Sequence, residues 1–96
     1  MMKQHILLAE DEPGLVLTLT DRLLHEGFSV SSARDGVLAT TMGLQPTFDL
    51  ILLDVLLPRR NGFEVCHQLR QGKCRTPILM LTALGDVADR VRGLDL

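Results

Sequence analysis

The stretch that decides the fold is residues 50–58, which read Leu-Ile-Leu-Leu-Asp-Val-Leu-Leu-Pro. The four apolar residues that open it are typical of a β-strand covered on both faces. Asp54 interrupts the apolar run and residues 55–57 continue it, so we expect the strand to resume after the aspartate. A carboxylate taken out of water there is costly unless it is neutralised, paired with a cation or used. Asp54 is therefore the first candidate functional residue. The structural alternatives are a solvated carboxylate at a strand edge and a cap for the next loop.

Similar apolar segments lie on both sides of this stretch. Further strands are expected at Ile6–Ala9, Phe28–Ser31 and Pro77–Leu81. Between the strands, apolar residues recur at helical spacing, and helices are expected to begin near Pro13, Asp35, Asn61 and Asp86. Strands that alternate with helices of this length indicate an α/β fold, with a parallel sheet covered by helices on both faces.

Several residues fix the expected helix ends and buried faces. Gly27 stands where the first helix needs a left-handed end residue. Asn61 and Glu64 have the spacing of a capping box. Leu24 is expected to widen the buried stripe of the first helix, and Phe63 to lie on the buried face of the third.

Length and composition bound the class of protein. Residues 1–96 are expected to form one domain, and 46% hydrophobic with 23% charged residues is ordinary globular composition. The net charge is −2 and the basic residues are scattered, so this segment is not expected to contact nucleic acid. No apolar stretch is long enough to span a bilayer, and Cys66 and Cys74 are expected to be reduced thiols. These features favour a cytoplasmic protein without membrane contact.

Acidic residues mark the carboxyl ends of two of the expected strands. Glu10 and Asp11 come directly after the first strand, and Asp54 follows the four apolar residues that open the third. Ligands of such sheets gather at the carboxyl ends of the strands, so these three carboxylates are expected to converge. Convergent carboxylate oxygens without His or Cys favour Mg2+, and a carboxylate beside Mg2+ suggests phosphoryl transfer to that carboxylate. Thr82 closes the fourth strand, where its hydroxyl is suited to a phosphoryl oxygen; a plain β-branched strand residue is the alternative.

Together these segments resemble the receiver domain of two-component response regulators. The resemblance rests on Glu10-Asp11-Glu12, on Leu52-Leu53-Asp54-Val55-Leu56-Leu57-Pro58 with Asn61-Gly62, and on Pro77-Ile78-Leu79-Met80-Leu81-Thr82-Ala83. It spans essentially the whole chain, and the three segments are specific only in combination. The segment Asp89-Arg90-Val91-Arg92-Gly93-Leu94 further resembles the subfamily whose receivers precede a winged-helix DNA-binding domain.

The resemblance implies a flavodoxin-like sheet of order 2-1-3-4 and a role for each acidic residue. Asp54 is implied as the phosphoacceptor, and Asp11 as a direct Mg2+ ligand together with Asp54 and the backbone carbonyl of Leu56. Glu10 is implied to help through water, and Thr82 to be the switch hydroxyl. The implied donor is the phosphohistidine of a sensor histidine kinase, and the implied output is a DNA-binding domain outside this chain. Such a protein is not a classical enzyme, because it catalyses at most its own phosphotransfer and dephosphorylation.

The sequence departs from the family pattern at its end. Receivers continue into a fifth strand, a lysine that pairs with the phosphoryl group and a fifth helix, and the 96-residue sequence stops before all three. The expectation is a fragment or a receiver cut short, with the fourth strand as an open hydrophobic edge. Self-association as a dimer or a strand-swapped oligomer is therefore predicted.

Two rival functions stay open at this point. A haloacid-dehalogenase-type phosphohydrolase also uses a strand-end aspartate and Mg2+, but it needs a second acid where this chain has Leu56. A receiver-like interaction module that is never phosphorylated is the other alternative. Arg59 and Arg60 form a small basic pair after the candidate phosphoacceptor; a solvated loop is the expected structure there, and a role in partner recognition is the alternative.

Overall fold

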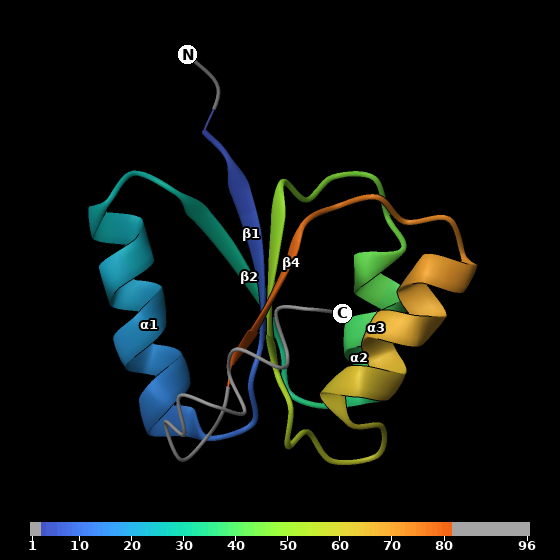
Figure 1. The fold of residues 1–96 in the computed structure, drawn as a ribbon. Coiled ribbons are helices and arrows are strands. Elements are labelled where there is room, and N and C mark those ends of the chain that lie inside the picture. The colour runs from blue at the N-terminus through green and yellow to red at the C-terminus, as the bar shows by residue number, and fades with distance from the viewer. Residues whose placement is uncertain (1–2, 82–96) are drawn as a thin grey trace.

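The computed structural model describes residues 3–81 and has one parallel sheet between two layers of helices (Figure 1). The strands are β1 (His5–Ala9), β2 (Ser29–Ala33), β3 (Leu50–Asp54) and β4 (Ile78–Leu81), and the helices are α1 (Pro13–His25), α2 (Gly36–Gly43) and α3 (Gly62–Gln71). The strand order is β2-β1-β3-β4, with every neighbouring pair parallel. The predicted fold class and strand order are confirmed, while the helix expected from Asp86 lies outside the described residues.

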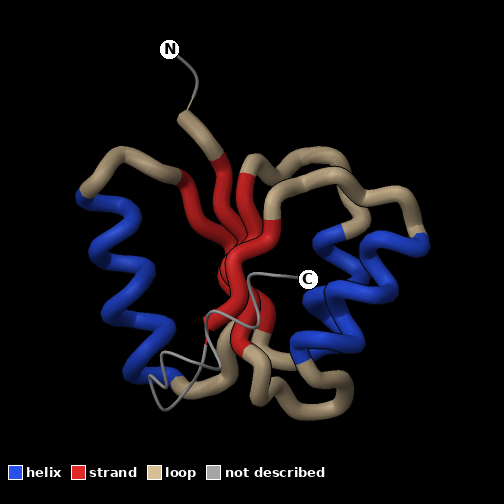
Figure 2. The backbone as a smooth tube through the Cα atoms, in the orientation of Figure 1, coloured by secondary structure: helices blue, strands red, loops and turns tan. Residues whose placement is uncertain are grey.

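The sheet separates two hydrophobic cores. Helix α1 covers one face, and α2 and α3 lie together on the other, as Figures 1 and 2 show. Side chains alternate across the strands, so Leu7, Ile51 and Leu53 point to the α2–α3 side while Ile6, Leu8 and Leu52 point to α1. Residues of β1 and β3 are therefore buried on both faces. Within residues 3–81 no helix is long and apolar enough to cross a membrane.

Strand β3 ends at Asp54, so the expectation that it resumes over residues 55–57 is wrong. The Val55 N–H still bonds to the Leu81 carbonyl (3.0 Å), but the Val55 carbonyl accepts from Gly62 N–H (2.9 Å), which turns the chain toward α3. The apolar run reflects packing of a loop, because Leu57 is buried in the α2–α3 core whereas Leu56 is 60% exposed.

The expected buried faces of two helices need correction. Leu24 is 51% exposed, because the buried stripe of α1 runs through Val16, Leu19 and Leu23, and the next position turns away from the sheet. Phe63 is 36% exposed at the first turn of α3. The buried face of α3 instead consists of Gly62, Val65, Cys66 and Leu69.

The predicted helix ends are confirmed where polar side chains or glycine determine them. Asp35 caps α2 by accepting from Leu38 N–H (2.8 Å). Asn61 and Glu64 form the capping box of α3, each side chain accepting from the other's N–H (2.9 and 3.0 Å). Gly27 follows α1 with a φ of 95°, a conformation that favours glycine.

The register of the central strands positions the site. Ala9 pairs with Leu53 across β1 and β3, so Glu10, directly after β1, and Asp54, the last residue of β3, lie side by side. The Glu10 N–H bonds to the Ala33 carbonyl on the other side of β1 (3.0 Å), which holds the start of this loop at the sheet. The carboxyl ends of the two most buried strands therefore share one charged rim.

Candidate functional site

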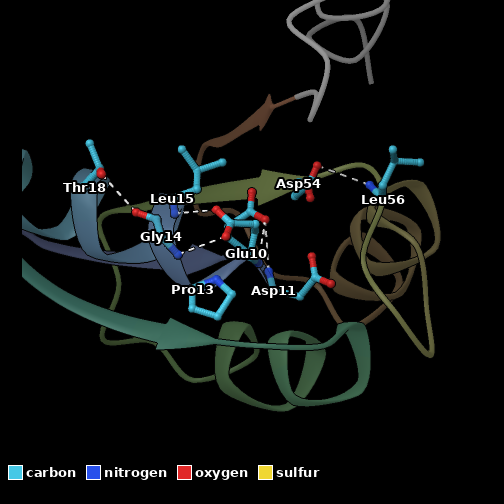
Figure 3. Close-up of a pocket in the computed structure, with 9 residues that line it drawn as sticks. Glu10, Asp11, Pro13, Gly14, Leu15, Thr18, Asp54 and Leu56 are labelled. Atoms are coloured by element: carbon cyan, nitrogen blue, oxygen red, sulfur yellow. Dashed lines mark hydrogen bonds between the residues drawn. The ribbon is translucent and has the colours of Figure 1, made fainter.

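Three carboxylates converge at the carboxyl ends of β1 and β3. Glu10, Asp11 and Asp54 each offer an oxygen, and these oxygens all lie within 4.8 Å of one another. Figure 3 shows the three carboxyl groups around one open space beside the start of α1. The predicted convergence of these residues is confirmed by the geometry.

Glu10 is a buried acid held by backbone donors. Glu10 is only 3% exposed, and its Oε2 accepts from the N–H groups of Asp11 and Glu12 (3.1 Å each). Burial raises the pKa of the Glu10 carboxyl, the charge of Asp54 raises it further, and the two N–H bonds oppose the shift. The proton is therefore held more tightly here than on an exposed glutamate.

Asp54 is the most deeply buried of the three acids, with 1% of its surface exposed. Its Oδ1 accepts from the Leu56 N–H (3.2 Å), the contact drawn in Figure 3. Burial raises the pKa of Asp54, the Leu56 N–H opposes this shift, and the negative charge of Asp11 adds to it. Two buried carboxyls with raised pKa values thus share one rim, an arrangement that a cation would relieve.

Asp11 and Glu12 differ from Glu10 although they follow it directly. Asp11 is exposed and completes the acidic cluster from the solvent side. Glu12 belongs to α1, because its carboxylate caps that helix by accepting from Gly14 N–H (3.1 Å) and Leu15 N–H (2.7 Å). The third acid of the Glu10-Asp11-Glu12 segment is therefore a helix cap.

The surroundings of the cluster are an open pocket without a paired cation. Pro13, Gly14, Leu15, Thr18 and Leu56 line it together with the acids. Over residues 3–81 the structure records one salt bridge, Arg22 Nε to Glu26 Oε1 (3.6 Å), on the exposed side of α1. No basic side chain in this range therefore lies within salt-bridge distance of the three carboxylates. Their charges are left to solvent, to protons or to a bound cation.

Two predicted site atoms are not tested by this geometry. Thr82, the predicted switch hydroxyl, lies outside the described residues. Leu56 lines the pocket, and the role of its carbonyl as a metal ligand stays a prediction.

A contact that sequence reasoning missed joins the loop after Asp54 to α2. The expected solvated loop is wrong for Arg60, because this residue is half-buried and its Nη1 donates to Thr40 Oγ1 (3.1 Å). The two residues are twenty positions apart, and neither lies in a recognised motif. No local pattern signals their contact.

The sequence model of the response regulator receiver domain matches residues 6–96. The chain belongs to this family. The family predicted from the acidic and strand-end segments is thereby confirmed, and the acidic cluster stands in a receiver domain of a two-component system.

Curated relatives of this receiver are transcriptional regulators. It is 46% identical over 90 residues to the transcriptional regulatory protein TcrA of Mycobacterium tuberculosis H37Rv, covering 94% of this chain and 36% of that protein. It is 45% identical over 95 residues to the alkaline phosphatase synthesis regulator PhoP of Bacillus subtilis, covering 99% of this chain and 40% of that protein. The chain thus spans less than half the length of these relatives.

Solved receiver domains share the fold. The non-phosphorylated HemR receiver domain of Leptospira biflexa superimposes with a TM-score of 0.82 at 35% identity, covering 97% of this chain and 75% of that one. The receiver domain of a sensor histidine kinase from Pseudomonas aeruginosa PAO1 superimposes with a TM-score of 0.83 at 31% identity, covering 97% of this chain and 77% of that one. That second structure was solved with a magnesium ion coordinated in its active site cleft.

Proposed function

We propose that this receiver domain accepts a phosphoryl group on Asp54 from the phosphohistidine of a sensor histidine kinase, with Mg2+ as cofactor. The observation that carries the proposal is the convergence of the Glu10, Asp11 and Asp54 oxygens within 4.8 Å, without a basic side chain among residues 3–81 at salt-bridge distance. Such a cluster is unfavourable by itself, and it suits a site that gains a cation and a phosphoryl group.

The donor set fits Mg2+. The three residues supply carboxylate oxygens, and the cluster within the described residues contains no His or Cys. Asp11, Asp54 and the Leu56 carbonyl would hold the ion directly, and Glu10 would help through water. When bound, Mg2+ supplies positive charge that keeps Asp54 ionised and offsets the charge of the phosphoryl oxygens.

Asp54 performs the covalent step. One of its carboxylate oxygens bonds to phosphorus as the phosphorus–nitrogen bond of phosphohistidine breaks, and the electron pair of that bond stays on the ring nitrogen. The Leu56 N–H donates to Oδ1 of Asp54, and so orients the carboxylate (3.2 Å). Thr82 would donate its hydroxyl to a phosphoryl oxygen. The product is an aspartyl phosphate.

Phosphorylation would control a DNA-binding output domain. Support for this output comes from the relatives, which are named as transcriptional regulators and are more than twice as long as the aligned receiver. Self-association of the chain as a dimer or a strand-swapped oligomer is also part of the proposal, and light scattering tests it: a monodisperse monomer would contradict it.

Intact mass spectrometry tests the phosphoacceptor. The chain is incubated with Mg2+ and a small acyl-phosphate donor, alongside Asp54→Asn and Asp21→Asn, the latter removing an exposed aspartate of α1. We expect a gain of one phosphoryl group in the parent and in Asp21→Asn, none in Asp54→Asn, and none with a chelator. A parent that neither gains mass nor binds Mg2+ would contradict the proposal and favour a receiver-like module that acts by protein contacts alone.

A further inference from the structure

The loop of residues 55–61 between β3 and α3 contacts the Asp54 carboxylate. Its Leu56 N–H donates to Asp54 Oδ1 (3.2 Å), and the Leu56 carbonyl is the metal ligand proposed above. The loop contains no helix or strand, so contacts with neighbouring elements must hold its path. The contacts that hold it therefore affect the geometry of the acidic site.

Helix α2 supplies backbone contacts to this loop. The Gly36 N–H donates to the Pro58 carbonyl (3.0 Å). The two backbones approach so closely that a β-carbon on Gly36 would lie 1.8 Å from the Arg60 carbonyl oxygen. The first residue of α2 thus packs directly against the loop, and only glycine fits there.

A side-chain contact adds to the backbone contact. Arg60 Nη1 donates to Thr40 Oγ1 (3.1 Å), and Thr40 Oγ1 donates to the Gly36 carbonyl (2.8 Å). The threonine hydroxyl has one proton and two lone pairs, so it makes both bonds at once. Thr40 is 7% exposed and Arg60 is half-buried, and the positive charge of the guanidinium strengthens this hydrogen bond. This contact, called here the Arg60–Thr40 link, ties the loop to the second turn of α2.

Arg59 provides a natural comparison within the same loop. It carries the same charge as Arg60 and precedes it directly, but its side chain is exposed. Its φ of 70° marks a left-handed turn, and none of the side-chain hydrogen bonds recorded over residues 3–81 involves it. Substitutions at positions 59 and 60 therefore separate the charge of the loop from the Arg60–Thr40 link.

We propose that Arg60 and Thr40 are positioning residues for the acidic site. Their link fixes the loop so that Leu56 presents its N–H to Asp54 and its carbonyl to the bound Mg2+. Groups that orient metal ligands from behind typically change metal affinity by about tenfold or more when they are removed. The metal part of this proposal rests on the proposed function, whereas the orientation of the Leu56 N–H does not.

The test measures Mg2+ affinity by calorimetry and the Leu56 amide resonance by NMR, with chemical denaturation as a record of folding. The variants are Thr40→Val, Arg60→Gln, their double mutant, Thr40→Ser and Arg59→Gln. We expect Thr40→Val and Arg60→Gln each to weaken Mg2+ binding about tenfold, with little further loss in the double mutant. Thr40→Ser and Arg59→Gln should bind like the parent. The Leu56 amide of the metal-free protein should shift in the first two variants, which a uniform loss of stability does not produce.

Several results would overturn the proposal. One is a folded Arg60→Gln variant with parental Mg2+ affinity and an unshifted Leu56 amide; another is an equal loss in Arg59→Gln, which would make the effect one of charge alone. If Thr40→Val does not fold, the Mg2+ affinities and Leu56 amide shifts of Arg60→Gln and Arg59→Gln decide whether the proposal holds. Failure of the proposed function looks different: the parent itself does not bind Mg2+, while the Leu56 amide in metal-free protein still reports on the link.

Discussion

Replacing Asp54 by asparagine should stabilise the metal-free protein at neutral pH. Asp54 is 1% exposed and is one of the three carboxylates whose oxygens lie within 4.8 Å of one another. Asparagine has nearly the same shape, keeps an oxygen that accepts from the Leu56 N–H, and removes one of the buried charges. The variant thus loses the repulsion without losing the packing or the hydrogen bond.

The magnitude follows from the separation of the charges. At 4.8 Å, the upper limit of the oxygen separations, and an effective dielectric constant of about 20, two unit charges repel by about 3 kcal/mol. Protonation limits this penalty, because neutralising a carboxyl of ordinary pKa near 4 at pH 7 costs about 4 kcal/mol. We therefore expect Asp54→Asn to raise the free energy of unfolding by about 1–3 kcal/mol, and the midpoint of thermal unfolding by about 5–20 °C.

Thermal unfolding followed by far-UV circular dichroism measures this effect, since the chain has no Trp and no Tyr to report by fluorescence. The parent and Asp54→Asn are compared at pH 7 with chelator and again with millimolar Mg2+. The stability difference should shrink with Mg2+, because a ligand that binds the folded parent stabilises it by mass action. An Asp54→Asn variant that is no more stable than the parent at pH 7 without metal would refute the reasoning.

Three further outcomes are expected. Without divalent metal, the stability of the parent relative to Asp54→Asn should fall as pH rises from about 4 to 7. The reason is that Glu10 and Asp54 have raised pKa values in the folded state, so the folded state binds more protons than the unfolded state in this range. Equal pH slopes of the two proteins in denaturant titrations would contradict this. Arg59→Gly should stabilise by about 1 kcal/mol in urea, because Arg59 has a φ of 70°, and a destabilised variant would point to a contact of the arginine. Leu69→Ala should cost about 2–5 kcal/mol in the same assay, because Leu69 is fully buried on α3, and a loss well below 1 kcal/mol would contradict its place in the core.

The sequence predicted those features that depend on short segments. The apolar runs of β1 and β3 determine the sheet, and the Asn61–Glu64 spacing determines the start of α3, because capping is a local hydrogen-bond pattern. The acidic cluster was also predictable. Parallel strands end at one rim, so acids that follow two neighbouring strands meet there.

Features that depend on tertiary packing were predicted less well. Leu56 and Leu57 have the same chemistry, yet the loop after β3 buries one and exposes the other. Hydrophobic periodicity placed Leu24 on the buried face of α1, although the width of that face depends on how the helix lies on the sheet. The Arg60–Thr40 link joins two elements through long-range packing, and no pattern within either segment specifies it.

The sandwich of helices around a doubly buried sheet has a consequence for how this domain unfolds. Strands β1 and β3 contribute alternate side chains to both hydrophobic cores, so both cores lose packing contacts when these two strands separate. If α1 detaches, one face of β1 and β3 loses its packing, and Ile6, Leu8 and Leu52 become exposed to water. The same two strands also carry the core on the other face of the sheet. The two cores therefore melt together, and the amide protons of the central strands should exchange with solvent only through global opening of the domain.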